Sequence, residues 1–298
     1  MILFERDRLH RALSAPPVNI YERNESSIMN WMEELFGVKK PIIAMCHLQP
    51  LPGDPYYDQE KGMEYVLECA RKDMHALQNG GVDGIMFSNE FSLPYLTKVE
   101  PITLAAMGWV IGALKNEITV PYGVNCLWDP IASLDLCVSV GGKFIREIIT
   151  GVYASDFGLW NTNVGQTVRH KMAIGAKDVK MLYNIVPEAA KYLADRSIED
   201  IARSTEFNNR PDALCVSGLT AGSETDTQVL SRVKKSVKHT PILCNTGCNK
   251  DNIVRQLSNS DGAVCATTFK YDGKFENAVD ETRVKAFMDV VKEYRKTL

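Results

Sequence analysis

The feature that most constrains the fold is an alternation of short apolar runs and amphipathic runs, which continues from residue 41 to the C-terminus. The apolar runs have the length and composition of buried β-strands, and they lie at residues 41–48, 83–90, 120–129, 143–150, 178–186, 213–218, 241–247 and 262–270. A run with helical character follows each of them. In the first of these, apolar residues recur at steps of three and four, which places them on one stripe of a helix: Met63, Val66, Leu67, Ala70, Met74 and Leu77.

Eight strand–helix pairs in succession predict a (β/α)8 TIM barrel with eight parallel strands, because such apolar strands are buried on both faces. The main alternative is an open doubly wound sheet, which normally carries a glycine-rich fingerprint after its first strand. Residues 47–54 contain no such fingerprint. We therefore expect one barrel domain over residues 31–298. Residues 1–30 lack the alternation and carry Pro16-Pro17 among scattered charges, so we expect an N-terminal extension outside the barrel.

The composition excludes several classes of function. The net charge is −3 and no basic cluster is longer than Lys234-Lys235, so we expect no nucleic-acid partner. We find no secretory signal and no apolar stretch that could span a bilayer, so the cytoplasm is the expected location. Most of the eight cysteines lie in apolar runs, as reduced buried thiols do. Cys244 and Cys248 have no second ligand pair at zinc-site spacing, so we expect no metal and no cofactor.

Polar residues gather at the ends of the predicted strands, on the face where barrel enzymes build their sites. Buried strands rarely carry such residues unless they meet a ligand, water or one another. The catalytic candidates are Glu90, Glu147, His47 and Asp129, with the two glutamates as general acid and base. The candidates for substrate binding are Asn125, Arg146, Asn184 and Lys270. Asn125 and Asn184 would orient hydroxyl groups, and Lys270 or Arg146 would balance charge on an enediolate.

Each of these residues also has a structural interpretation. Asp129 precedes Pro130 and has the position of a helix N-cap, which we consider the stronger interpretation. The two glutamates could form structural ion pairs, the two asparagines could bridge neighbouring strands, and His47 could be an ordinary buried histidine. Because side chains alternate between the faces of a strand, Arg146 and Glu147 cannot both point into the barrel. We predict that Glu90 and Glu147 lie in one pocket at the C-terminal face, and in that case Arg146 must point toward the helices.

The loops after the last three strands predict a phosphate site. Glycines let a backbone approach an oxyanion closely, and amides at a helix start supply hydrogen-bond donors. The loops after strands seven and eight are also the usual phosphate site of such barrels. The phosphate-binding candidates are Ser217, Gly218, Gly222, Thr246, Gly247, Thr267 and Thr268. The alternative is that these glycines serve only the geometry of tight turns.

An ordered set of motifs resembles the BtpA/SgcQ family, and the SgcQ branch most closely. The motifs lie at residues 43–48 (Ile-Ala-Met-Cys-His-Leu), 51–54 (Leu-Pro-Gly-Asp), 80–90, 128–130 (Trp-Asp-Pro), 144–147 (Phe-Ile-Arg-Glu) and 212–222. The resemblance runs from about residue 31 to the C-terminus. It implies a TIM barrel related to the ribulose-phosphate-binding barrels. The chain departs from phosphate-binding relatives at Ala266, where many of them have glycine in strand eight.

The resemblance does not imply one settled reaction. The cyanobacterial branch is associated with photosystem I biogenesis and peripheral attachment to a membrane, and the SgcQ branch with sugar-utilisation genes. From the residues and the resemblance together we expect an enzyme that acts on a phosphorylated sugar or similar small metabolite by proton transfer, as an isomerase, epimerase or lyase. The alternatives are a non-catalytic biogenesis or stabilisation factor and a nucleoside- or base-processing hydrolase. A homo-oligomer is compatible with each of the three.

Overall fold

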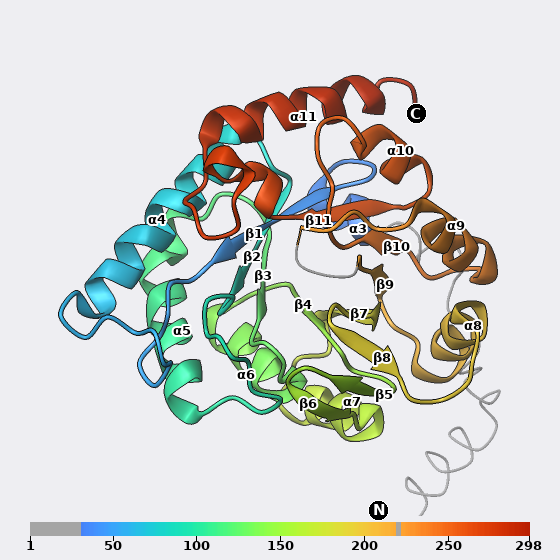
Figure 1. Cartoon of the computed structure of the whole chain (residues 1–298), viewed down its shortest axis with the longest axis horizontal. Coiled ribbons are helices and arrows are strands. Elements are labelled where there is room, and N and C mark those ends of the chain that lie inside the picture. Colours follow the sequence, from blue (N-terminus) through green and yellow to red (C-terminus); the bar gives the residue numbers. More distant parts are fainter. Residues whose placement is uncertain (1–30, 219–221) are drawn as a thin grey trace, which may run out of the picture.

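A computed structural model describes residues 31–218 and 222–298, and it shows a closed barrel of eight parallel strands (Figure 1). Around the barrel the strands follow the order β1-β11-β10-β9-β7-β4-β3-β2. They are β1 (Ile42–His47), β2 (Gly84–Ser88), β3 (Tyr122–Asn125), β4 (Phe144–Glu147), β7 (Lys180–Val186), β9 (Ala213–Val216), β10 (Ile242–Cys244) and β11 (Gly262–Cys265). The predicted fold class is confirmed. The prediction for residues 1–30 lies outside the described residues.

Helices surround the barrel and follow the strands in sequence (Figure 1). They are α4 (Gly62–Gly80), α5 (Pro101–Leu114), α6 (Pro130–Val140), α7 (Val164–Ala173), α8 (Ile198–Asn209), α9 (Thr227–Ser236), α10 (Ile253–Ser258) and α11 (Glu281–Arg295). Local sequence explains where several of them begin and end. Gly81 adopts a left-handed conformation that ends α4, and the Ser197 hydroxyl accepts a hydrogen bond from the backbone N–H of Asp200 at the start of α8.

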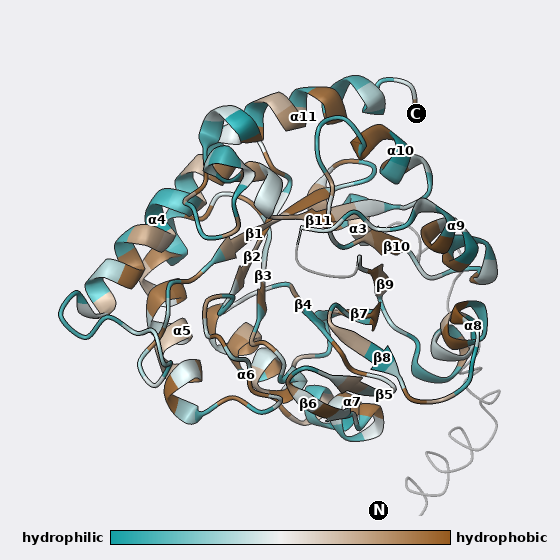
Figure 2. Cartoon of the chain, viewed as in Figure 1, coloured by the Kyte–Doolittle hydropathy of each residue, from teal (hydrophilic) through white to brown (hydrophobic). Residues whose placement is uncertain are grey.

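Alternation along the strands divides the core into an outer layer against the helices and an inner layer inside the barrel. The inner layer contains Ile43, Met45, Met86, Phe144, Leu182, Cys215, Leu243 and Val264. A short helix, α3 (Trp31–Phe36), packs Trp31, Met32 and Phe36 against the N-terminal end of this layer. Figure 2 shows the resulting pattern, with hydrophobic barrel strands and helices that alternate between hydrophobic and hydrophilic residues. Apolar side chains therefore fill the interior of the barrel, and its polar residues lie at the C-terminal ends of the strands.

Two regions differ from the sequence prediction. The segment after the predicted strand 143–150, where no strand is predicted, contains two strands of a small antiparallel sheet, β5 (Val152–Ser155) and β6 (Gly158–Asn161), and β8 (Ala190–Tyr192) completes it. An aromatic cluster that includes Trp128, Tyr153 and Trp160 supports this sheet. The last barrel strand is also shorter than predicted, because the chain leaves it after Cys265 and turns into two 3-10 helices, η2 (Thr267–Phe269) and η3 (Tyr271–Gly273).

Candidate functional site

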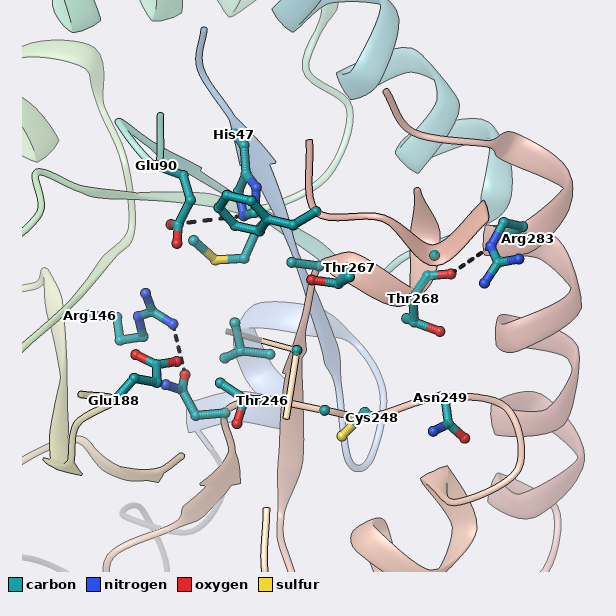
Figure 3. Close-up of a pocket in the computed structure, with 18 residues that line it drawn as sticks. His47, Glu90, Arg146, Glu188, Thr246, Cys248, Asn249, Thr267, Thr268 and Arg283 are labelled. Carbon is teal, nitrogen blue, oxygen red and sulfur yellow. Dashed lines mark hydrogen bonds and ion pairs between the residues drawn. The ribbon is translucent and has the colours of Figure 1, made fainter. Parts of the chain in front are cut away.

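A pocket of about 240 Å³ lies at the C-terminal ends of the barrel strands (Figure 3). Residues from β1 and β4 and from the loops after β2 and β7 form one side of it, and the loops after β10 and β11 form the other. From the sequence-predicted set, its lining contains His47, Glu90, Arg146, Gly222, Thr246, Gly247, Thr267 and Thr268. Residues separated by more than 200 positions in the chain thus meet in one hollow, at the predicted face.

His47 and Glu90 lie side by side in the pocket. The His47 Nε2 atom is 3.9 Å from Oε2 of Glu90, and the imidazole ring packs against the rings of Phe91 and Phe275. Burial, with the charges of Lys270 and Arg146, holds the pKa of His47 well below its usual value, so this imidazole is neutral at pH 7. Within the described residues, His47 Nδ1 has no hydrogen-bond partner although it is buried. Burial raises the pKa of Glu90, which makes its carboxylate a stronger base.

Arg146 is buried on the inner face of β4 and is held by neutral amides. Its Nη2 and Nε atoms donate to Oδ1 of Asn125 at 2.7 and 3.2 Å, and its Nη1 atom donates to Oδ1 of Asn245 at 2.9 Å. Asn245 donates in turn to the Ser217 hydroxyl at 2.8 Å, and the Asn184 amide contacts the same hydroxyl at 3.3 Å. Asn125, Asn184 and Ser217 therefore do not line the pocket but fix the arginine that does.

The structure reverses the predicted directions of Arg146 and Glu147. Glu147 lies on the outer face of β4, where Oε1 accepts hydrogen bonds from Asn125 Nδ2 at 2.6 Å and from the Ser133 hydroxyl of α6 at 2.7 Å. The expectation that Glu147 shares a pocket with Glu90 is wrong, because alternation gives the inner face to Arg146. Burial raises the pKa of Glu147 to about 8. It is a neighbour of the site and not part of its lining.

Asp129 caps a helix, as the stronger of its two interpretations predicted. Its Oδ1 atom accepts hydrogen bonds from the backbone N–H groups of Ile131 and Ala132, both at 3.1 Å, at the start of α6. It does not line the pocket. Lys270 also lies outside the lining, beyond the end of β11. Its Nζ atom donates to the backbone oxygen of Asn277 at 2.9 Å and lies 5.1 Å from the ring centre of Phe91.

The glycines of the predicted phosphate site have two different roles. A Cβ atom at Gly218 or Gly247 would lie 2.5 or 2.2 Å from the backbone of residues 223–224, so Gly218 lets the loop after β9 fold back on itself and Gly247 lets the loop after β10 pack against it. This supports the alternative of loop geometry for both, although Gly247 also lines the pocket. Gly222 also lines the pocket, but its Cβ atom would lie 3.3 Å from the Thr267 hydroxyl and not against a backbone. Gly218 donates its backbone N–H to the Thr246 hydroxyl at 2.5 Å.

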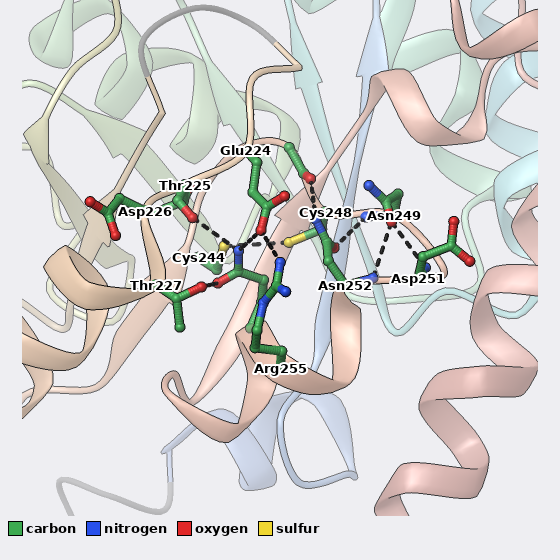
Figure 4. A network of polar contacts seen from close by, with 12 residues as sticks. Glu224, Thr225, Asp226, Thr227, Cys244, Cys248, Asn249, Asp251, Asn252 and Arg255 are labelled. Carbon is green, nitrogen blue, oxygen red and sulfur yellow. Dashed lines mark hydrogen bonds and ion pairs between the residues drawn. The ribbon is translucent and has the colours of Figure 1, made fainter.

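A network of polar contacts cross-links the loops after β9 and β10 beneath this side of the pocket (Figure 4). The Thr225 hydroxyl donates to the backbone oxygen of Thr246 at 3.1 Å, and Gln256 donates to the backbone oxygen of Thr225 at 3.0 Å. The Asn252 amide donates to the backbone oxygen of Gly247 at 2.9 Å. The first two contacts join the loop after β9 to the loop after β10 and to α10, and the third lies within the loop after β10, so together they support the backbone around Thr246 and Gly247.

The lining also contains residues that the sequence analysis did not select, among them Glu188, Cys248, Asn249, Phe275 and Arg283. Glu188 follows β7, and burial raises the pKa of its carboxyl group to about 7. Its place just beyond a barrel strand could have identified it. Arg283 lies in the first turn of α11, and its Nε atom donates to the backbone oxygen of Thr268 at 2.9 Å. No strand-end pattern indicates Arg283, because it comes from the helix that follows a long loop.

The fold and the pocket define a TIM-barrel protein with a polar, small-molecule-sized hollow at the C-terminal strand ends. The chain belongs to the BtpA family, whose model matches residues 38–293. It is 60% identical over 268 residues to the sgc region protein SgcQ of Escherichia coli (strain K12), which covers 90% of this chain and 100% of the relative. It is 30% identical over 263 residues to the photosystem I biogenesis protein BtpA of Synechocystis, which covers 87% and 91%.

Solved structures resemble the chain in fold alone. GGGPS from Thermoplasma volcanium aligns with a TM-score of 0.55 at 12% identity, over 91% of this chain and 98% of that one. An archaeal fructose 1,6-bisphosphate aldolase aligns with a TM-score of 0.51 at 15% identity, over 90% and 100%. At these identities only the barrel architecture is shared. In the described part of the chain, no helix has both the length and the apolar character needed to cross a bilayer.

Proposed function

We propose that the chain is an enzyme that acts on a phosphorylated sugar or a similar small metabolite by proton transfer. The observation that carries the proposal is the division of the pocket into two sides. One side presents Thr267, Thr268 and Arg283 around the closely packed backbone at Gly247, as an oxyanion requires. The other side presents His47, Glu90 and Arg146, which supply proton-exchanging groups and a fixed cation.

The side chains of the second side suit the formation of an enediol. A carboxyl group with a raised pKa can remove a proton from a carbon beside a carbonyl group, and a buried guanidinium group can stabilise the oxyanion that develops. Schiff-base chemistry has no nucleophile here, because no lysine of the chain lines the pocket and the structure describes them all. The chemistry that remains is acid–base catalysis on a bound carbonyl compound.

A thermal-shift experiment tests the phosphate half of this proposal. We expect sugar phosphates to raise the melting temperature of the protein, and the same sugars without phosphate to have no effect, because a ligand stabilises the state that binds it. Replacing Arg283 with Met should weaken this binding by about tenfold, as expected for the loss of one charge-assisted contact. Arg232→Met is the matched control, since Arg232 pairs with Glu199 on the outer helices. Equal stabilisation by sugars with and without phosphate would contradict the proposal.

One observation favours a second candidate, a non-catalytic assembly factor. Helix α5 contains no charged residue, and it exposes Ile102 and Trp109, which are 47% and 45% accessible. Such an apolar surface is typical of a docking face. A relative that is named for photosystem I biogenesis is consistent with this reading. An assembly factor would keep its function when Glu90 and Arg146 are replaced, whereas an enzyme would lose it.

A further inference from the structure

Glu188 occupies an unusual place in the backbone of the barrel. The register between β7 and β9 shifts between Asn184 and Val186, so the end of β7 bulges just before Glu188. Ala189, directly after it, has a φ of 51°, in the left-handed region that residues with a Cβ atom seldom adopt. Bulges and left-handed residues of this kind re-aim side chains and concentrate at functional sites. Here they turn the Glu188 side chain into the pocket.

The surroundings of Glu188 complement those of Glu90. Figure 3 shows the two carboxyl groups on either side of Arg146, with Glu90 above it and Glu188 below it in the view. Glu90 follows β2 and Glu188 follows β7, so they come from separate parts of the barrel rim. Among the described residues, no cation lies within ion-pair distance of Glu188, and its neighbours Arg146 and Glu90 have opposite effects on its charge. Glu188 is thus not part of a structural ion pair.

The small sheet anchors the chain next to Glu188. Strand β8 begins at Ala190 and pairs with β5, so the chain is anchored two residues after Glu188. Tyr95, in the aromatic cluster beneath this sheet, donates its hydroxyl to the backbone oxygen of Glu90 at 2.8 Å. The same accessory structure therefore supports both carboxyl groups. A barrel that needed only a wall at this point would not require a charged residue there.

We infer that Glu188 and Glu90 form a proton-transfer pair on either side of Arg146, and that the substrate is a phosphorylated α-hydroxy aldehyde or ketone. This inference rests on the proposed function and specifies its reaction. The pair replaces the one predicted from the sequence, in which Glu147 accompanied Glu90. Arg146 would face the oxygen atoms of the carbonyl and hydroxyl groups, and the phosphate would lie toward Thr267, Thr268 and Arg283.

The reaction balances without any further reagent. Glu90, as a carboxylate, takes the proton from the hydroxyl-bearing carbon, and the electron pair of the broken C–H bond forms the C=C bond of an enediol. The carbonyl oxygen takes a proton from the Glu188 carboxyl group. In the second half, Glu188 removes the proton from the other oxygen, and Glu90 returns its proton to the former carbonyl carbon. Arg146 stabilises the oxyanion in both halves, and both glutamates end as they began.

Exchange in ²H₂O tests the pair. Triose, pentose and hexose phosphates are incubated with the full-length protein, and product formation and deuterium uptake at the hydroxyl-bearing carbon are followed by ¹H NMR. We expect both reactions with wild type for at least one aldose or ketose phosphate. Glu90→Gln should lower both by about 10²-fold or more, because the base is lost. Glu188→Gln should lower product formation by a similar factor but exchange by much less, because Glu90 can still remove and return the proton.

Controls separate catalysis from folding. Glu199→Gln makes the same change on an outer helix and should leave both rates unchanged. If Glu188→Gln does not fold, Glu188→Asp takes its place and should lower product formation more than exchange, whereas Glu90→Asp should lower both alike. A Glu188→Gln protein that turns over at the wild-type rate, or that loses both rates equally, overturns the inference. Sugar phosphates that bind without any exchange in wild type overturn it too, while phosphate recognition stands. If no sugar phosphate binds, the proposed function itself fails.

Discussion

Arg146 and Glu147 are neighbours in the sequence but belong to opposite faces of β4 and to different environments. Asn125 connects them, because its Oδ1 atom accepts hydrogen bonds from Arg146 and its Nδ2 atom donates to Glu147. The charge state of Glu147 therefore affects the amide that orients the pocket arginine. Glu147 thus contacts Asn125 and not the pocket itself.

We expect Glu147→Gln to stabilise the protein in alkaline solution. Glutamine keeps an oxygen that can accept from Ser133 and Asn125, but it cannot ionise. The folded-state pKa of Glu147 is raised to about 8, above its unfolded value, so the protein binds the proton more tightly when folded. This contribution to stability is full at acidic pH and is lost as the pH rises toward 8. The free energy of unfolding of the variant, relative to wild type, should therefore be roughly 2–4 kcal/mol higher above pH 8 than at pH 4.

Urea denaturation of both proteins at pH 4, 6 and 9 measures this difference. Glu206→Gln serves as the opposite control, because backbone hydrogen bonds from residues 238–240 hold the pKa of that carboxyl group below its usual value. The Glu206→Gln substitution should therefore lower the free energy of unfolding more at neutral pH than at acidic pH. A Glu147→Gln effect that does not change with pH would mean that this carboxyl group ionises freely in the folded protein.

The pKa of Glu188 gives a second prediction, on activity. A group that donates a proton must hold it, and burial raises this pKa to about 7. We expect kcat for the proposed isomerisation to fall as the pH rises through about 7. In Glu188→Gln this alkaline limb should disappear from the residual activity, because the titrating group is gone. A pH–rate profile of the two proteins decides the matter, and an unchanged limb would assign it to another group.

At the scale of single residues, the sequence located the strand ends but not the face on which each side chain lies. His47 and Glu90 were found at strand ends, and both line the pocket. The sequence does not show which face of β4 points into the barrel. One face carries Phe144 and Arg146 and the other carries Ile145 and Glu147, so each combines one apolar and one charged residue. Alternation shows which residues share a face but not which face is inside.

Among the secondary-structure elements, the loops after the strands determine the shape of the site. All eight barrel strands and the helices between them follow from the apolar periodicity in the sequence, because buried parallel strands need continuous apolar runs. The small sheet of β5, β6 and β8 could not be predicted from that periodicity, because each of its strands has only three or four residues and much of its surface is exposed. Residues 267–269 belong to the apolar run 262–270 that predicts the last strand, yet they form the 3-10 helix η2.

Two glycines with similar backbone conformations offer a test of loop packing. Gly247 has a φ of 69° and Gly175 a φ of 75°, so alanine at either position meets the same left-handed strain of about 1 kcal/mol. A Cβ atom at Gly247 would also lie 2.2 Å from the backbone at Glu224, whereas at Gly175 it meets nothing within 4 Å. We expect Gly247→Ala to lose at least about 2 kcal/mol more than Gly175→Ala, measured by denaturant unfolding. Equal losses would show that the two loops do not pack as closely as described.

At the scale of the whole molecule, the pocket and the apolar surface lie on different parts of the barrel. The pocket opens at the strand ends, whereas α5 and α6 form part of the outer wall (Figure 1). The exposed positions of α5 are apolar along its length, and its neighbour α6 adds Val138, which is 41% accessible. A helix that is hydrophobic on all sides is normally buried. The position of the surface therefore allows an assembly role without closing the proposed active site.

We expect this surface to bind a second copy of the chain. Helix α5 carries no charged residue, so this surface suits an uncharged partner. In a dimer with a twofold axis the same surface meets its own copy, which is such a partner. Sedimentation equilibrium at micromolar concentration should give a dimer for wild type and a monomer for Trp109→Glu, because a buried unpaired charge opposes association. Phe207→Glu is the matched control: Phe207 is 70% exposed on α8, away from α5, and its replacement should leave the dimer intact. A monomeric wild type would contradict self-association and would leave α5 to a different partner, as an assembly factor requires.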